Sequence, residues 1–186
     1  MGLSIEGIGK TNLKVSVKFF EMLEKEGIHT HHISSDIDRS SMDVQKAEFF
    51  GKGLEIICRY RAVGSFLRRY GAYVKEGDKL NAYVEATLKD DERGDPLVTA
   101  EGLGGLGIMS VEQFEQIKAD TRRIAGLIKK ELEKKGLELY DIKLEFGLDE
   151  DGRVMLIDEI SSGNMRVYKN GKIMDPMELN KALLDE

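Results

Sequence analysis

Three charged residues alternate along one short segment, and two acidic residues follow it beyond a turn. Asp141, Lys143 and Glu145 are separated by single apolar residues, and Asp158 and Glu159 come next. Side chains of a strand alternate between its faces, so the first three share one face. Carboxylates are the oxygen ligands that Mg²⁺ takes and lysine attracts phosphate, so the spacing fits a magnesium-nucleotide site. The solvated face of a hairpin explains the alternation equally well.

A β-hairpin would bring these groups together. We expect residues 139–147 to form its first strand, with a core face made by Tyr140, Ile142, Leu144 and Phe146. The sequence Asp-Glu-Asp-Gly at 149–152 is typical of a tight turn, and 153–160 fits the returning strand. This hairpin would place Asp158 beside Glu145.

A second cluster is basic. Four arginines lie around the dipeptide Gly64-Ser65, namely Arg59, Arg61, Arg68 and Arg69. The dipeptide can open a helix whose free amides bind an anion, with the arginines adding charge. The alternative is an ordinary helix start with surface arginines.

Three weaker patterns favour structural explanations. The glycine-rich run 102–107 matches a dinucleotide fingerprint but lacks the preceding apolar strand, so we expect a mobile loop. His29, His31 and His32 have no nearby cysteine or acidic ligand, which favours a surface strand over a metal site. The acidic residues at 90–95 fit a solvated turn, or a site for a metal or an amine.

Composition excludes several classes of protein. The chain has 186 residues, 41% of them hydrophobic, and a net charge of -6. Without a long basic run we expect no nucleic-acid partner, and without a long apolar run no membrane span. The single cysteine, Cys58, lies in an apolar stretch and is predicted to be buried. A cytoplasmic location follows as an expectation.

Mixed helices and strands without a regular βαβ repeat predict the α+β class. The predicted strands cover 28–34, 42–50, 54–60 and 83–88. The predicted helices cover 12–26, 61–70 and 110–135, the last with a capping box made by Ser110 and Gln113. We expect the apolar side of helix 12–26 to be partly exposed or covered by another subunit, in a homo-oligomer.

Several stretches together resemble the SAICAR synthetase family of purine biosynthesis. They are residues 5–12, 27–33, 55–66, 88–96, 141–147 and 158–161. The resemblance implies a two-lobe fold related to ATP-grasp. Residues 1–50 would be the remnant of a nucleotide lobe, and residues 51–186 the lobe that binds substrate and magnesium.

The resemblance also implies a reaction and its residues. The family joins L-aspartate to carboxyaminoimidazole ribotide with ATP and Mg²⁺. By position, Lys143, Asp95 and Asp141 would be catalytic, with Lys143 on nucleotide phosphate. The implied substrate-binding residues are Arg59, Ser65, Arg166 and Lys89, and the implied magnesium ligands are Glu145 and Asp158.

Two departures from the family pattern keep alternatives open. The family begins with a small sheet whose lysines cover ATP, and we expect this lid to be absent here. Gly163 stands where the family usually has an aspartate. A non-catalytic protein that binds ribotide or nucleotide, and a ligase acting on a different amine, therefore remain alternatives.

Overall fold

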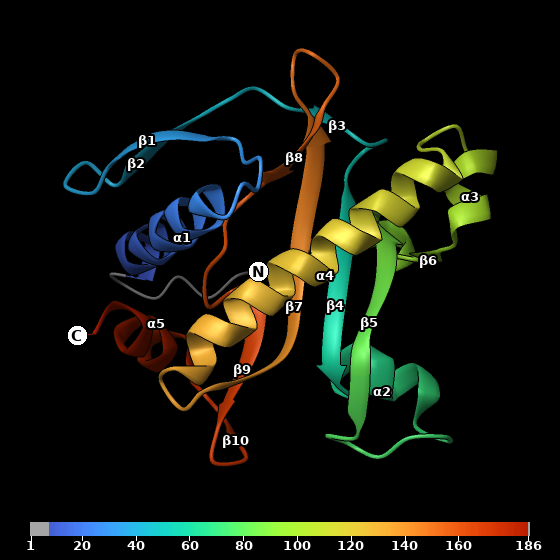
Figure 1. Ribbon diagram of the computed structural model, residues 1–186. Helices are drawn as coiled ribbons and strands as arrows, with labels where there is room; N and C mark the ends of the chain where they lie inside the picture. The colour runs from blue at the N-terminus through green and yellow to red at the C-terminus, as the bar shows by residue number, and fades with distance from the viewer. Residues whose placement is uncertain (1–7, 186) are drawn as a thin grey trace.

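A computed structural model describes residues 8–185, and its centre is one antiparallel β-sheet (Figure 1). Within those residues the sheet has eight strands, six of them in the order β10-β9-β7-β4-β5-β6. Its strands are β3 (Glu48–Phe49), β4 (Leu54–Arg61), β5 (Lys79–Leu88), β6 (Leu97–Val98), β7 (Glu138–Leu148), β8 (Val154–Ile157), β9 (Met165–Lys169) and β10 (Lys172–Ile173). A separate small sheet pairs β1 (His32–Asp36) with β2 (Ser41–Val44).

Helices surround the sheet, and the α+β prediction is confirmed. They are α1 (Ile8–Lys25), α2 (Gly64–Tyr70), α3 (Ala100–Gly105), α4 (Val111–Glu133) and α5 (Pro176–Leu184), with a 3₁₀ turn η1 (Asp91–Arg93). The predicted stretch 5–12 lies partly outside the described residues.

Strand β7 is the centre of the sheet because both of its edges are paired. One edge pairs with β4 and β3, and the other pairs with β9 and β8. The predicted hairpin of β7 and β8 is therefore confirmed. In its turn, the Asp149 carboxylate accepts N–H bonds from Asp151 and Arg153, which fixes the reversal.

A bulge in β7 overturns one detail of the predicted core face. The register against β9 shifts between Leu139 and Asp141. Leu139 is fully buried in the core, whereas Tyr140 stacks on Tyr168 with ring centroids 3.6 Å apart. Tyr140 therefore does not share the core face, because an extra residue in a strand breaks the alternation. From Ile142 onward the expected alternation holds.

Helix α4 covers one face of the sheet and crosses β7, β4 and β5 (Figure 1). The predicted capping box is present, since Ser110 and Gln113 exchange side-chain to backbone hydrogen bonds. Ile117 and Ile128 belong to the same buried cluster as the β4 and β7 side chains that face this helix. The intervening side chains of both strands, which carry the candidate chemistry, therefore point to the opposite face.

The apolar side of α1 is covered by the chain itself. Val15, Phe20 and Leu23 are fully buried, and α5 packs beside α1. The expectation of an exposed or subunit-covered face was wrong for these three residues, whereas Val17, which was expected on the same face, is half-buried. The sheet core and α5 together supply the apolar contacts that the helix needs.

Four other local predictions were wrong. The first histidine strand begins only at His32, and His31 is buried against Phe20, with ring centroids 5.4 Å apart. Residues 42–50 split into β2 and β3, and the helix predicted from 61 begins at Gly64. The glycine-rich run contributes to α3 instead of a mobile loop, because Thr99 caps the helix and buried Leu103 anchors it.

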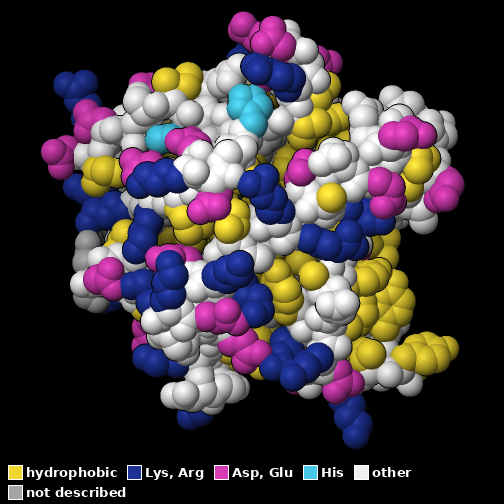
Figure 2. All heavy atoms as spheres, viewed as in Figure 1, with side chains coloured by type: hydrophobic (Ala, Val, Ile, Leu, Met, Phe, Trp, Pro, Cys, Tyr) yellow, Lys and Arg dark blue, Asp and Glu magenta, His cyan; other side chains and the backbone are white. Residues whose placement is uncertain are grey.

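Charged side chains of both signs are interspersed over the surface that carries α4 (Figure 2). Hydrophobic side chains are more frequent toward β5 and α2, where Tyr73 and Tyr83 are exposed. None of the helices in residues 8–185 has the length and apolarity needed to cross a membrane.

Candidate active site

A pocket of about 220 Å³ lies on the face of the sheet away from α4. Its polar lining comes from four elements: Arg59 on β4, Ser65 on α2, Asp141 and Lys143 on β7, and Arg166 on β9. Gly163 and Asn164 complete one side. We call this the anion pocket, because cationic and hydroxyl groups surround it.

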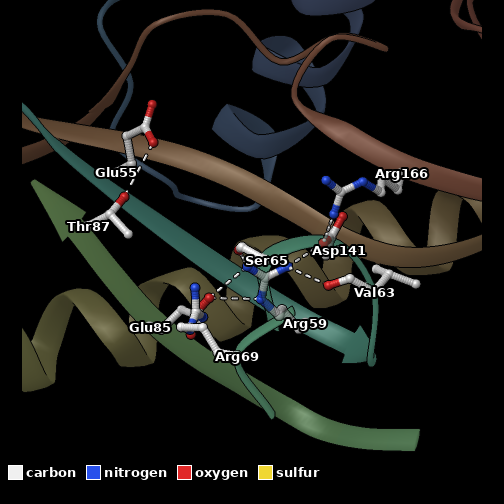
Figure 3. Close-up of polar contacts among 9 residues, drawn as sticks. All are labelled: Glu55, Arg59, Val63, Ser65, Arg69, Glu85, Thr87, Asp141 and Arg166. Atoms are coloured by element: carbon white, nitrogen blue, oxygen red, sulfur yellow. Dashed lines mark hydrogen bonds and ion pairs between the residues drawn. The ribbon is translucent and has the colours of Figure 1, made fainter. Parts of the chain in front are cut away.

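Arg59 lines the anion pocket, is almost completely buried and lies among polar partners (Figure 3). Its Nη1 donates to the Asp141 carboxylate at 2.6 Å, and its Nε and Nη2 both donate to Glu85. Remaining donors reach the Val63 carbonyl and the Ser65 hydroxyl. With these partners in place, Arg59 holds neighbouring groups and has no N–H group left for a ligand.

Arg166 is the more accessible guanidinium. Its Nη1 donates to Asp141 at 2.7 Å, while 41% of its side chain is exposed. Asp141 thus sits between two arginines. Burial raises the pKa of its carboxyl above the usual value, and the two guanidinium groups oppose that shift.

A glycine at the start of α2 makes room for Arg166. Gly64 has φ +57, and an added Cβ would lie 2.3 Å from Nη1 of Arg166. Only glycine combines this left-handed conformation with so close an approach. The same backbone brings Ser65 to the pocket.

A second pocket of about 380 Å³ lies further along β7. Apolar side chains, including Val44, Phe49 and Ile157, form one part of its wall. Charged groups form the other part, contributed by Lys46, Lys89, Glu145 and Asp158. We call this the carboxylate pocket.

Lys89 and Glu145 form an ion pair of 2.5 Å in the carboxylate pocket. Burial raises the pKa of Glu145 and nearby Asp158 adds to the rise, whereas Lys89 opposes it. Burial alone would lower the pKa of Lys89, but its hydrogen bond to Glu145 raises it overall. The two neighbouring carboxylates, Glu145 and Asp158, are the kind of oxygen ligand that a hard cation takes.

The backbone of Asp158 adopts a left-handed conformation, with φ +67. His31 supports it, because Nε2 of the imidazole lies 3.1 Å from the Asp158 carbonyl and donates to it. Burial lowers the pKa of His31, and the neutral ring retains this N–H.

Lys143 lies on β7 between the two carboxylates Asp141 and Glu145. Its ammonium donates to Glu55 on β4 at 2.8 Å, and 41% of its side chain is exposed. The strand alternation therefore places one accessible cation between the anion pocket and the carboxylate pocket.

A family model described as SAICAR synthetase matches residues 1–184. The chain belongs to the SAICAR synthetase family. The phosphoribosylaminoimidazole-succinocarboxamide synthase of Clostridium tetani is 54% identical over 186 residues, which are 100% of this chain and 82% of that protein. The corresponding synthase of Finegoldia magna is 40% identical over 89% of this chain and 69% of that protein.

Solved structures of the SAICAR synthetase family have the same fold. A SAICAR synthetase in complex with ADP superposes with a TM-score of 0.89 at 30% identity, over 98% of this chain and 83% of that one. The Pyrococcus horikoshii SAICAR synthetase superposes with a TM-score of 0.88 at 30% identity, over 98% and 85% of the two chains.

Most residues singled out by the family resemblance gather in these two pockets. Those lining the anion pocket are Arg59, Ser65, Asp141, Lys143 and Arg166, and those lining the carboxylate pocket are Lys89, Glu145 and Asp158. Asp95 lines neither. Its carboxylate accepts the Asp90 N–H within the turn that follows β5, and its role stays a prediction.

Sequence reasoning missed three residues that support the site. Glu85 and Glu55 are acidic residues within otherwise apolar strand segments, and each holds a basic residue of the pocket. An isolated charge inside an apolar strand was the available signal. His31 gave no signal of its own, because its partner is a backbone carbonyl 127 residues away.

Proposed function

We propose that this chain is an ATP-dependent ligase that joins L-aspartate to carboxyaminoimidazole ribotide. Family membership supports the reaction class. The observation that carries the proposal is the shared face of β7. There Asp141 and Lys143 meet the anion pocket, and Glu145 meets the carboxylate pocket.

The anion pocket would hold the ribotide. Arg166 has donors directed away from Asp141, and Ser65 has a hydroxyl hydrogen to donate. An exposed guanidinium suits a phosphate or a carboxylate, because its parallel N–H groups bind two oxygens. Arg59 would contact the ribotide only by exchanging one of its present partners.

The carboxylate pocket would hold the nucleotide. Its apolar wall suits a base, and Lys89 suits the phosphates. We propose residues 1–50 as the nucleotide region and residues 51–186 as the substrate region. The pocket takes Val44 and Phe49 from the first and Glu145 and Asp158 from the second.

Magnesium would bind at Glu145 and Asp158. Within the described residues no group of three or more His, Cys, Asp or Glu side chains could form a metal cage. Mg²⁺ commonly uses one or two carboxylates and completes its shell with water and substrate phosphates, so the donor set fits. Bound there, the ion would neutralise charge on the phosphates.

The chemistry would run in two steps. The ribotide carboxylate attacks the terminal phosphorus of ATP, giving an acyl phosphate and releasing ADP. The aspartate amine then attacks the acyl carbon, loses a proton, and expels phosphate. Lys143, between the pockets, would stabilise charge on the transferred group, and Asp141 would orient Arg166.

A second candidate is ligation of a different amine. Gly163 lines the anion pocket without a side chain, and the nearest atoms to an added Cβ are 3.8 Å away. An added Cβ would thus meet only ordinary contacts, and the absence of a side chain at this position is what favours an amine other than aspartate.

The test is product formation measured by mass spectrometry with ATP, Mg²⁺, ribotide and one amine at a time. We expect the succinocarboxamide product and ADP only when aspartate is present. Lys143→Gln should abolish turnover, whereas Lys52→Gln, at an exposed lysine outside both pockets, should not. No product with aspartate, but product with another amine, would favour the second candidate.

A further inference from the structure

Five side chains of alternating charge form a continuous line from the anion pocket toward the protein surface (Figure 3). In order they are Arg166, Asp141, Arg59, Glu85 and Arg69. The ion-pair distances along this line are 2.7, 2.6, 2.6 and 2.5 Å. The middle three side chains are buried, and the two ends are partly exposed.

Glu85 controls the orientation of Arg59. One carboxylate oxygen of Glu85 accepts both the Nε and the Nη2 hydrogens of Arg59, at 2.9 and 2.6 Å. The other oxygen accepts from Arg69. Because a guanidinium is planar and rigid, fixing this edge also fixes the direction of Nη1.

Arg59 in turn orients two groups of the anion pocket. Its Nη2 donates to the Ser65 hydroxyl at 2.8 Å, so that oxygen acts as an acceptor and keeps its own hydrogen for donation to an anion. Its Nη1 donates to Asp141, which also holds Arg166. Ser65 and Arg166 thus depend on the same buried guanidinium.

Glu85 does not line the anion pocket. A buried ion pair is a poor way to gain stability, because desolvation offsets much of the attraction. We propose that Glu85 is a positioning residue for anion binding, which acts through Arg59 on Ser65 and Arg166. This inference rests on the proposed function only in taking the anion to be the ribotide phosphate.

The first test compares two carboxylate-to-amide variants. Glu85→Gln keeps the shape of the side chain but removes its charge, and should weaken calorimetric binding of carboxyaminoimidazole ribotide about tenfold. ATP affinity should change by less than about twofold, because the carboxylate pocket is separate. Glu138→Gln is the matched control, since Glu138 pairs with Arg61 on the same sheet, outside the anion pocket. It should leave both affinities unchanged.

A double-mutant cycle separates positioning from general stability. If Glu85 acts through Ser65, then Glu85→Gln should cost clearly less ribotide affinity in a Ser65→Ala background than in the unaltered protein. Equal costs in both backgrounds, or equal loss of ATP and ribotide binding, would overturn the proposal. Urea unfolding of each variant identifies any loss that reflects unfolding.

Arg69→Gln provides a second route if Glu85→Gln does not fold. It frees only the outer oxygen of Glu85 and should weaken ribotide binding by a smaller factor, with ATP binding unchanged. Unchanged ribotide binding in a folded Arg69→Gln protein would count against the proposed positioning role of Glu85. If the unaltered protein itself bound no ribotide, the proposed function would fail together with this inference.

Discussion

Glu145 and Asp158 are the residues on which the magnesium-dependent part of the proposal depends. Replacing either with alanine removes an oxygen ligand, and in Glu145→Ala it also leaves Lys89 without its partner. We expect magnesium-dependent ATP affinity to fall at least ~10–100-fold. Losing a group that only supports a metal ligand has an effect of that size, and these two carboxylates would be ligands themselves. Titration with and without Mg²⁺ measures this. Glu150→Ala, in the exposed turn after β7, is the control. Unchanged affinity in both site variants would mean that Glu145 and Asp158 do not hold magnesium.

Arg59→Lys should weaken ribotide binding while the protein still folds. Lysine retains the charge, but all its donors sit on one nitrogen and not on the three nitrogens of a planar fork, so it cannot reach Glu85, Asp141 and Ser65 together. Calorimetry with ribotide and circular dichroism together check the expectation. Ribotide affinity equal to that of the unaltered protein would mean that another group organises the anion pocket.

At the scale of elements, the start of α2 gives a sharp prediction. Gly64→Ala and Gly77→Ala both place a side chain at positive φ, which costs about 1–2 kcal/mol of unfolding free energy in each case. Only the methyl group at position 64 would strike the Arg166 guanidinium, whereas nothing lies within 4 Å at position 77. Ribotide affinity should therefore fall in Gly64→Ala alone.

The contrast between these glycines makes the measurement decisive. Chemical denaturation should show a stability loss in both variants, at least as large in Gly64→Ala because Arg166 must also shift. A Gly77→Ala protein that lost ribotide affinity as strongly as Gly64→Ala would show that backbone strain, and not contact with Arg166, is responsible.

The elements themselves were only partly predictable from sequence. Apolar periodicity and a capping box were enough for α4, because both signals lie within the helix. The bulge at Tyr140 was not predictable, since it depends on how β9 pairs with β7. Alternation along β7 predicted that Asp141, Lys143 and Glu145 share one face. The ion pairs of Glu85 and Glu55 were not predictable, because each joins two different strands and depends on how those strands pair.

At the scale of the whole molecule, His31 joins the N-terminal region to the β7–β8 hairpin. It packs against Phe20 of α1 and donates to the Asp158 backbone. Burial lowers its pKa in the folded state, so below about pH 6.5 the unfolded chain binds a proton that the folded chain resists. The stability that the neutral ring contributes is thus present above that pH and lost as pH falls toward the folded-state pKa.

His31→Gln should flatten this part of the pH profile. Glutamine can still donate an N–H group to the Asp158 carbonyl but does not titrate. Unfolding free energies of both proteins, measured by denaturant between pH 8 and pH 5 (roughly the range in which histidine titrates), should diverge on the acidic side. Parallel curves across the range would exclude His31 as the source.

The single strand shared by both pockets has a consequence for inhibitor design. Asp141 and Glu145 are four residues apart on one face of β7, which at ~3.3 Å per residue is a spacing of about 13 Å. A compound that tethers a phosphorylated sugar to a nucleotide would need only a short linker to occupy the anion pocket and the carboxylate pocket together. Joining the halves would raise the effective concentration of the second, so the conjugate should bind far more tightly than either half alone.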